Sequence, residues 1–269
     1  MALTLGTAPF GERPAGRFNF ETPGRGILYI EDSPRRVRGL LGGQVVVDST
    51  RVRLLHESGH LPVWYFPEED VRSELLRPSQ KVTRCPWKGE TVYFSVEAGG
   101  RRAEDAAWSY REPLPGAAPI AGYLAFHFHK LDEWLEEEEP AIGHPRDPYH
   151  RIDVRDTSRR VRISIDGQLV AESSRPKALF EAGLPTRWYV PREDVRMELL
   201  EATDKDTVCA YKGHASYWSV GEEDDVAWTY EEPLTDAVAV RGLVAFFNER
   251  VDVEVDGERE ERPVTQWSR

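Results

Sequence analysis

Hydrophobic residues recur at every second position along much of the chain, which is the period of a half-buried β-strand. The segment 161–165 is the clearest example, and a second strand is expected over Gln168–Glu172. Asp166 and Gly167 separate the two segments. Since a type I′ turn needs positive φ at both central positions, an Asp-Gly pair between alternating segments predicts a β-hairpin.

The same pattern occurs twice because the chain contains an internal repeat. Residues 31–96 align without a gap with residues 155–220 at a constant offset of 124, and about half of the positions are identical. After a four-residue deletion the offset becomes 120, which aligns AAWSYREPL with VAWTYEEPL. Gly42-Gly43 replaces the Asp-Gly pair in the first copy and meets the same backbone demand. Two similar domains are therefore expected.

The boundaries of the two domains follow from composition. We expect the first domain at 17–135 and the second at 151–256, with a linker over 136–150 and a charged tail over 257–269. The stretch that precedes the second domain holds four successive glutamates and three prolines, which is typical of a solvated linker. The tail is expected to be poorly ordered.

One short helix is predicted in each repeat, at PEEDVRSELL from Pro67 and at PREDVRMELL from Pro191. Proline suits the first helical position, and acidic residues in the first turn complement the helix dipole. Val71 and Leu75 would then share one face and pack on a sheet. Further strands are expected at 91–96, 106–110 and 123–128. The fold class expected is mainly β, with antiparallel strands and one short helix per repeat.

Charge and composition narrow the classes of function. The chain has 35 basic and 47 acidic residues, hence a net charge of −12, and we expect no nucleic-acid partner because a phosphate backbone would be repelled. A mean hydropathy of −0.55 and the lack of a long apolar stretch argue against a membrane protein. The first 20 residues lack the apolar core of a signal peptide, so the cytoplasm is the expected compartment. Two cysteines exclude a disulfide framework and a four-cysteine zinc site.

Residues kept in both copies predict a ligand pocket in each domain. Residues two apart in a strand share a face, so Trp108 is expected to lie beside Tyr110, and Tyr93 beside Ser95. A face of aromatic rings with a lysine at its edge is typical of a small-molecule pocket, and the alternative is an ordinary core whose hydroxyl groups bond to the backbone. The first pocket is predicted from Tyr65, Glu69, Arg72, Cys85, Lys88, Tyr93, Trp108 and Tyr110. The second is predicted from Tyr189, Glu193, Arg196, Cys209, Lys212, Tyr217, Trp228 and Tyr230.

The motif Cys-x-x-Lys-Gly is the main candidate for chemistry in each predicted pocket. Four of the six lysines stand at matched positions, Lys81/Lys205 and Lys88/Lys212, which suggests that they are placed for a purpose. An ammonium group near a thiol makes it more nucleophilic, so Cys85 and Cys209 are candidate nucleophiles. The alternative is a pair of buried structural cysteines. If a reaction occurs, Lys88 or Glu69 is the better candidate for proton transfer.

Three other groups of charged or imidazole side chains have a structural and a functional interpretation. Glu69 and Arg72 form a helix-surface ion pair, or Arg72 binds an anion while Glu69 or Asp70 holds it or moves protons. Arginine pairs repeated in both copies either form a solvated sheet face that pairs with nearby acidic residues or bind an anion. The paired imidazoles of the first copy suggest a metal pair, which the second copy lacks. The arginine pairs are Arg36 with Arg38 in the first copy and Arg160 with Arg162 in the second. The paired imidazoles are those of His127 and His129.

The ordered motifs RRVR, WY-x-P-x-E-D-V-R, C-x-x-K-G and AW-x-Y occur twice and resemble the bacterial and fungal family catalogued as domain of unknown function 427. Two tandem copies would cover about 85% of the chain. The resemblance implies a β-tent-like fold, which is also found in methionine-R-sulfoxide reductases and in the ligand-binding domain of cereblon. Many β-tent proteins hold a structural zinc ion between two Cys-x-x-Cys pairs, so one cysteine per repeat implies that this metal is absent here. No cofactor is expected. The family also carries a nucleotidyltransferase label, but this sequence contains no glycine-rich phosphate loop that would support it.

The sequence thus predicts two tandem antiparallel β-tent-like domains, each binding a small polar or anionic metabolite. The other hypothesis is a non-catalytic interaction module whose two repeats pair within the chain as a pseudo-dimer. A monomer or a weak homodimer is expected in either case. The ligand and any reaction stay open, because fold alone does not decide function.

Overall fold

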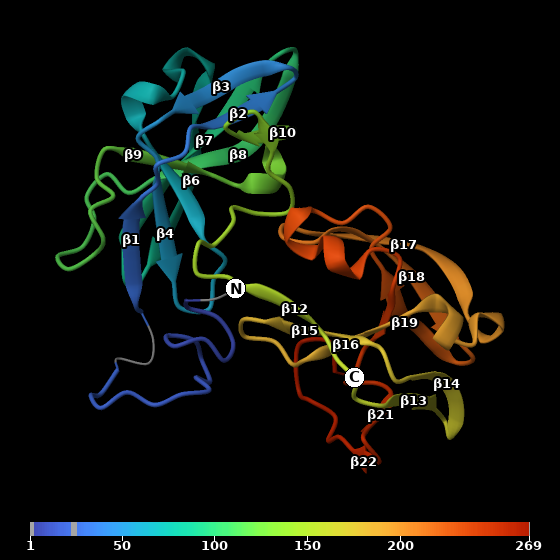
Figure 1. The fold of residues 1–269 in the computed structure, drawn as a ribbon. Coiled ribbons are helices and arrows are strands. Elements are labelled where there is room, and N and C mark those ends of the chain that lie inside the picture. The colour runs from blue at the N-terminus through green and yellow to red at the C-terminus, as the bar shows by residue number, and fades with distance from the viewer. Residues whose placement is uncertain (1–2, 23–25, 269) are drawn as a thin grey trace. The chain divides into compact units, whose positions relative to one another are not determined.

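The computed structural model of the protein describes residues 3–22 and 26–268. The chain divides into two compact units, Met1–Tyr149 and His150–Arg269 (Figure 1). Each unit is built from two antiparallel sheets, so the prediction of two tandem, mainly β domains is confirmed. No helix in the described part of the chain is long and apolar enough to cross a bilayer.

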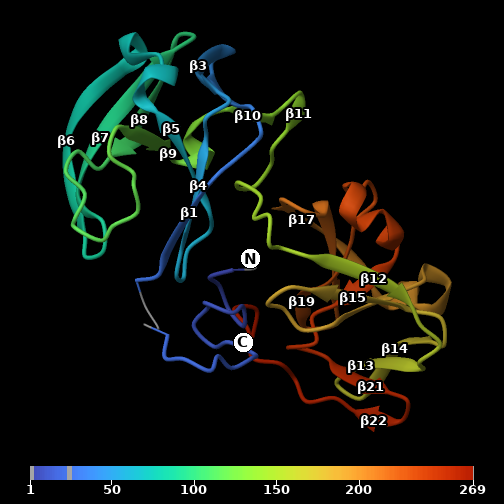
Figure 2. The same ribbon diagram turned by 60° about the vertical axis from the view of Figure 1, so that its left-hand side comes forward.

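The first unit pairs a large sheet with a small one. The large sheet comprises β1 (Leu28–Asp32), β4 (Arg53–Glu57), β5 (Val63–Pro67), β6 (Leu76–Cys85), β7 (Gly89–Ala98), β8 (Arg101–Ser109) and β9 (Tyr123–Phe126). Its strand order is β1-β4-β5-β9-β8-β7-β6. The small sheet comprises β2 (Val37–Leu41), β3 (Gln44–Ser49), β10 (Glu133–Glu136) and β11 (Glu139–Pro140), in the order β11-β10-β2-β3. Figure 2 shows β6, β7 and β8 running side by side, with β3 and β10 in a separate layer.

The second unit repeats this topology. Its large sheet comprises β12 (Ile152–Asp156), β15 (Lys177–Glu181), β16 (Arg187–Val190), β17 (Glu201–Cys209), β18 (Gly213–Val220), β19 (Glu223–Thr229) and β20 (Val244–Phe246). The order β12-β15-β16-β20-β19-β18-β17 matches that of the first unit strand for strand. Its small sheet comprises β13 (Val161–Ile165), β14 (Gln168–Ser173), β21 (Asp252–Val255) and β22 (Glu258–Arg259).

The predicted hairpin turns are confirmed. Asp166 and Gly167 have φ angles of 50° and 78°, as a type I′ turn requires, and they join β13 to β14. Gly42 and Gly43 have φ angles of 58° and 73° and join β2 to β3. Because a two-residue turn fixes the register of its strands, these short motifs determine which residues of each hairpin enter the core.

Each unit has apolar clusters on both faces of its large sheet. In the first unit, Trp64, Phe66 and Val96 pack with Trp134 of the small sheet. On the opposite face, a second cluster lies under the segment that connects β8 to β9, which contributes Ile120. A fully buried side chain of this size contributes about 1.5–3 kcal/mol relative to an exposed one, so both faces of the sheet are held by packing.

The helix predicted in each repeat is wrong. Residues 67–76 instead form two separate 3₁₀ turns, η1 (Glu68–Asp70) and η2 (Ser73–Leu75), on either side of an extended Val71. Val71 forms a β-bridge with Val47, and the Arg72 amide donates to the Val46 carbonyl at 2.9 Å. These bonds to a strand replace the helical ones, which is physically reasonable because a helix of ten residues is marginal by itself.

The second repeat shows the same departure from a helix. Its two turns, η4 (Arg192–Asp194) and η5 (Met197–Leu199), flank an extended Val195 that bridges to Ala171. The remaining 3₁₀ turns of the described residues are η3 (Phe128–Lys130) and η6 (Thr235–Val240). Val71 and Leu75 do pack against the core as expected, although they reach it from turns.

The segments expected to be a linker and a tail carry structure of their own. Within 136–150, Glu136 and β11 belong to the small sheet of the first unit. Within 257–269, β22 pairs with β21, and the Trp267 ring lies 6.1 Å from that of Phe247. In the run of glutamates, Glu136 is partly buried and pairs with Arg35, whereas Glu138 is exposed and pairs with Arg38 of β2.

Candidate functional site

The predicted aromatic face exists in the first unit. Tyr65, Trp108 and Tyr110 belong to one cluster on the outer face of the large sheet, so the prediction that Trp108 and Tyr110 share a face is confirmed. Tyr65 is only 1% exposed. Burial raises the pKa of the Tyr65 phenol well above its usual value, although a hydrogen bond with Trp108 opposes that shift. Burial likewise raises the pKa of Tyr110 to about 12. These phenols are therefore protonated and packed.

The second unit contains the same aromatic set. Tyr189, Tyr217, Trp228 and Tyr230 form one cluster, and the Trp228 indole N–H donates to the Tyr189 hydroxyl at 3.1 Å. Burial raises the pKa of both Tyr189 and Tyr230 above the usual range. Ala237 of η6 belongs to the same cluster. The four rings expected to wall the second pocket are thus packed together as core, as are Tyr65, Trp108 and Tyr110 in the first unit, where Tyr93 is partly exposed.

The matched lysines Lys81 and Lys205 lie close over aromatic rings. The Lys81 ammonium is 4.3 Å from the ring centre of Tyr93, and that of Lys205 is 4.7 Å from Tyr217. Each tyrosine hydroxyl is also bonded to a threonine on the neighbouring strand, at 3.0 Å to Thr83 in the first unit. These contacts are cation–π pairs at partly exposed positions, worth about 0.5–1 kcal/mol each. They explain why Lys81 and Lys205 are kept without assigning them a ligand.

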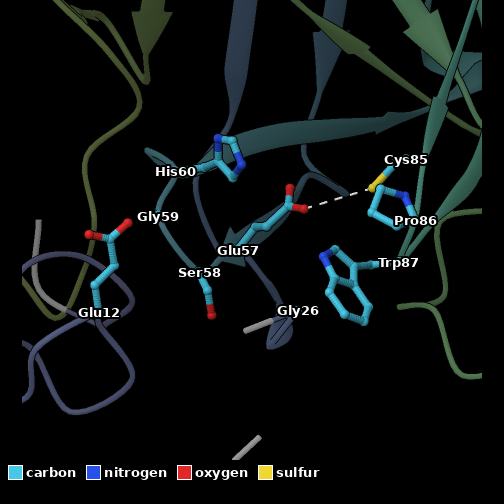
Figure 3. Close-up of a pocket in the computed structure, with 9 residues that line it drawn as sticks. All are labelled: Glu12, Gly26, Glu57, Ser58, Gly59, His60, Cys85, Pro86 and Trp87. Atoms are coloured by element: carbon cyan, nitrogen blue, oxygen red, sulfur yellow. Dashed lines mark hydrogen bonds between the residues drawn. The ribbon is translucent and has the colours of Figure 1, made fainter. Parts of the chain in front are cut away.

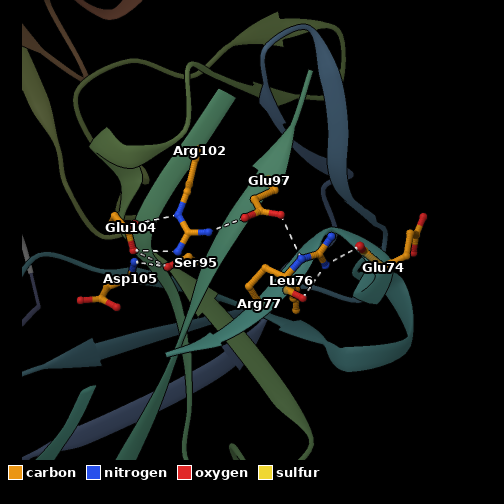
Figure 4. A network of polar contacts seen from close by, with 8 residues as sticks. All are labelled: Glu74, Leu76, Arg77, Ser95, Glu97, Arg102, Glu104 and Asp105. Atoms are coloured by element: carbon orange, nitrogen blue, oxygen red, sulfur yellow. Dashed lines mark hydrogen bonds and ion pairs between the residues drawn. The ribbon is translucent and has the colours of Figure 1, made fainter. Parts of the chain in front are cut away.

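The matched serines hold a β-bulge. The register of β7 against β8 shifts between Phe94 and Val96, and the Ser95 hydroxyl accepts from the Asp105 amide at 3.1 Å (Figure 4). Asp105 has a left-handed φ of 49°, which such a bulge needs. Ser95 also donates to Glu104, which joins an exposed network of arginines and glutamates (Figure 4). In the second unit the Asp225 amide donates to Ser219 at 3.0 Å in the same way.

The other two matched lysines form buried ion pairs with a glutamate that the sequence interpretation missed. Lys88 pairs with Glu57 at the end of β4, and their side chains are only 8% and 14% exposed. Gly89, with φ of +107°, makes the turn that directs the lysine inward. The Lys88 ammonium also lies 5.6 Å from the ring centre of Tyr110. The predicted aromatic face therefore ends in a buried pair of opposite charges.

The second unit repeats this pair in a more enclosed setting. Lys212 pairs with Glu181 at the end of β15, and the two side chains are 9% and 6% exposed. Burial opposes ionisation of Glu181, but a hydrogen bond from His150 and the charge of Lys212 outweigh it and lower its pKa to about 2. Burial lowers the pKa of His150 despite its contact with Glu181. The result is an ionised carboxylate between an ammonium group and an imidazole.

Glu57 and Glu181 had a signal in the sequence. They are identical residues at the repeat offset of 124, like the lysines they contact. Glutamate is abundant in this chain, however, so an identical pair does not stand out as a matched lysine does. Glu57 is also 31 residues from Lys88, and only the pairing of the strands brings the two together.

A cavity of about 590 Å³ opens beside the ion pair of the first unit (Figure 3). Of the residues predicted for the first pocket, Cys85 lies in its wall, with its sulfur 3.9 Å from Glu57 Oε1. The ammonium expected to activate that thiol is engaged by Glu57 instead. The cavity is lined by Glu12, Gly26, Glu57, Ser58, Gly59, His60, Cys85, Pro86 and Trp87.

In the second unit, side chains of that unit fill the equivalent place. The His150 Nε2 lies 2.9 Å from Glu181 Oε1, and its ring centre is 3.9 Å from that of Tyr211. Tyr211 is 3% exposed, whereas Trp87 at the corresponding position of the first unit is 47% exposed. The ion pair of Lys212 and Glu181 is thus covered by side chains, whereas the ion pair of Lys88 and Glu57 lies beside an open cavity.

The acidic and basic residues of the predicted helix lie elsewhere. Glu69 pairs with Arg51, and Arg72 with Glu74 at 2.8 Å, so the predicted Glu69–Arg72 ion pair is wrong because the helix that would align them is replaced by turns. Glu69 lines a separate hollow of about 460 Å³. In the second unit, likewise, Glu193 pairs with Arg175 and Arg196 with Glu198. The structure therefore does not bring these four predicted site residues together with the ion pairs of Lys88 and Lys212.

The interpretation of the repeated arginine pairs as part of a solvated sheet face, paired with nearby acidic residues, is confirmed. Arg36 donates to Asp48 at 2.7 Å and 2.6 Å, and Arg38 pairs with Glu138. In the second unit Arg160 pairs with Glu172, and Arg162 with Glu254 at 3.3 Å. These guanidinium groups already have anionic partners.

The imidazoles of His127 and His129 lie at the end of β9, with ring centres 5.9 Å apart. Burial, with the nearby charges of Lys130 and His129, lowers the pKa of His127 to about 4. Among the described residues, no group of three or more His, Cys, Asp and Glu side chains is placed to hold a metal ion. His127 instead stacks near Trp108, with ring centres 4.6 Å apart.

Comparison with known proteins identifies the family of the chain. The family model described as "Domain of unknown function (DUF427)" matches residues 29–137 and, a second time, residues 153–257. The two matched segments correspond to the two structural units. No curated protein matches the chain.

Proposed function

The chain belongs to the family of the domain of unknown function DUF427, which it carries in two copies, and from this premise we propose that its first unit binds a small polar metabolite. The binding site is the cavity beside Glu57 and Lys88. The second unit has the same framework and acts as a structural module. This assigns to one copy the role that the sequence suggested for both.

The observation that carries the proposal is a buried ion pair whose carboxylate, that of Glu57, lines an open cavity. Glu57 uses Oε2 to hold Lys88, while Oε1 faces the thiol of Cys85 in the cavity wall. A buried ion pair stabilises a fold little compared with apolar packing, so its presence beside an opening supports a role in recognition. Apolar and aromatic walls with a few polar groups are typical of small-molecule sites.

The charges of the cavity favour a ligand that donates hydrogen bonds. Glu57 and Glu12 supply carboxylates to the lining, and the ammonium of Lys88 is already held by Glu57. A simple anion would meet two carboxylates and no available cation among these three residues. The polar ligand of the proposal is therefore neutral or cationic, which narrows the expectation from the sequence.

A thermal-shift screen of small polar metabolites tests the proposal. A ligand present at 100 times its Kd adds about 2.7 kcal/mol to the stability of the state that binds it, which raises the Tm by several degrees. The shift should disappear in Glu57→Gln and become smaller in Trp87→Ala, which alters an exposed ring. The matched Glu181→Gln variant should keep it. A screen in which no compound raises the Tm would overturn the proposal.

We also propose the cytoplasm as the compartment of this protein. Both cysteines are free thiols, and thiols of this kind persist in a reducing environment. Cell fractionation with an antibody against the chain tests the assignment, and recovery from a secreted or membrane fraction would contradict it.

A further inference from the structure

The two units have equivalent backbones around the cavity, so one unit can be compared with the other residue by residue. The Ser58 amide donates to the Ile27 carbonyl at 3.1 Å, and the Ala182 amide donates to the Arg151 carbonyl at 3.0 Å. The strands that follow, β1 and β12, pair with β4 and β15 in the same register. Gly26 in the first unit therefore corresponds to His150 in the second.

In the second unit an imidazole occupies the position next to the carboxylate. Lys212 binds Glu181 Oε2, and His150 Nε2 lies 2.9 Å from Oε1. Because a carboxylate can only accept, the imidazole donates its Nε2 proton. Its ring centre lies 3.9 Å from that of Tyr211, with the ring planes inclined by 31°. An N–H donor and a stacked flat ring are thus the features that fill this place.

In the first unit the same partners are present without the imidazole. Lys88 binds Glu57 Oε2, as Lys212 binds Glu181. Trp87 replaces Tyr211 and lines the cavity together with Glu57, as Figure 3 shows. Gly26 contributes no side chain, and a Cβ built on it would lie 2.5 Å from the Trp87 ring. The Trp87 indole therefore takes the place where the side chain of residue 26 would begin. The cavity between this ring and Glu57 stays open to a molecule from solvent.

We propose that the cavity of the first unit binds a planar nitrogen heterocycle with an N–H donor, of which imidazole is the simplest. The N–H donates to Glu57 Oε1, and the ring packs against the indole of Trp87. Ser58 and His60, which line the same cavity, would face the substituents of a larger ligand. This inference rests on the proposed function, because it names the ligand class of the same site.

The first experiment compares imidazole with 1-methylimidazole at pH 8.5, where both are mainly neutral. Only imidazole then carries an N–H. Titration followed by NMR of the indole N–H groups should give saturable binding of imidazole, with 1-methylimidazole at least about tenfold weaker, since a hydrogen bond to a charged acceptor is lost. Equal affinities for the two probes, or no saturation by imidazole, would overturn the inference.

The second experiment uses the second unit as an internal control. His150→Gly removes the built-in imidazole, so the variant should bind imidazole at two sites, whereas the natural chain binds it at one. Trp87→Ala should weaken the first site several-fold and leave the new site of His150→Gly unchanged. A folded His150→Gly chain that gains no second site would overturn the inference. If that variant does not fold, His150→Ala takes its place. The comparison of imidazole with 1-methylimidazole uses the natural chain and tests the inference independently of both variants.

The outcomes separate this inference from the proposed function. If other polar metabolites raise the Tm and imidazole does not bind, the ligand class is wrong and the binding role stands. If neither imidazole nor any compound of the screen binds, both are wrong.

Discussion

The two units build the same Lys–Glu pair at the same turn and complete its surroundings differently. In the first unit Glu57 faces a cavity, and the neighbouring Trp87 is half exposed. In the second unit His150 and Tyr211 cover the equivalent carboxylate. Because the sheets and registers are shared, the difference lies in a few side chains. The side chains that cover Glu181 in the second unit thus indicate which chemical groups fit the cavity of the first.

A second location shows the same tendency. In the second unit the Arg187 guanidinium forms a buried ion pair with Glu249 at 2.7 Å and lies within 6 Å of the rings of Trp228, Phe247 and Trp267. At the corresponding place the first unit has Val63, and a hollow of about 200 Å³ is lined there by aromatic rings and imidazoles. The second unit has filled with its own side chains two places that the first leaves open.

The largest difference between the units is expected when the lysines are removed. Lys212→Ala leaves Glu181 ionised and enclosed, which should cost about 3–5 kcal/mol. Lys88→Ala should cost less, roughly 1–2 kcal/mol, since water in the cavity can reach Glu57. Guanidinium unfolding of the full chain measures both. The matched variants Lys81→Ala and Lys205→Ala, which remove partly exposed cation–π pairs, should each cost under about 1 kcal/mol. Equal losses for Lys88→Ala and Lys212→Ala would contradict the comparison.

The enclosure of Glu181 also predicts a dependence of stability on pH. Its pKa of about 2 in the folded protein lies below the ordinary value of 4.5. The contribution of Glu181 is therefore complete above about pH 4.5 and is lost as the pH falls from there to about 2. The loss should amount to about 3 kcal/mol. Unfolding free energies of the natural chain and of Glu181→Gln, measured from pH 5 to 2, should converge by that amount. A constant difference between them would contradict the prediction.

Local patterns in the sequence predicted the parts of the fold that depend on neighbouring residues. Asp166-Gly167 defines a turn through its own backbone preferences, and Trp108 and Tyr110 share a face because a strand has a period of two. The predicted helix failed because Val71 bonds to Val47, a residue far from it in sequence. Propensity within one segment does not include such a competitor.

The candidate site was predicted in part for the same reason. Lys88 was found by comparing the copies, but its partner Glu57 depends on the pairing of strands. The pair that distinguishes the units, Gly26 and His150, lies before the start of the clear alignment at residue 31. Their equivalence becomes visible only from the backbone bonds of Ile27 and Arg151.

The aromatic residues at this position should differ in their contribution to stability. Tyr211 is 3% exposed and stacks on His150, so Tyr211→Ala leaves a cavity in the second unit. Trp87→Ala removes a larger ring that is 47% exposed. We expect the tyrosine variant to lose roughly 2 kcal/mol more than the tryptophan variant, measured by denaturant unfolding. A greater loss for Trp87→Ala would mean that the first unit is closed in solution, against the comparison.

The smallest effect is expected in the reactivity of the two thiols. Cys85 lies in the wall of the open cavity, whereas Cys209 lies at the end of β17 in the unit where His150 and Tyr211 cover the ion pair. Iodoacetamide near neutral pH should therefore label Cys85 several-fold faster than Cys209, as peptide mass spectrometry over time can measure. In His150→Gly the rate at Cys209 should rise toward that of Cys85, because the cover is removed. Faster labelling of Cys209 in the natural chain would contradict the difference in access. Rates for both thiols below that of a free cysteine would exclude the nucleophile that the Cys-x-x-Lys motif suggested, since access alone does not make a thiol reactive.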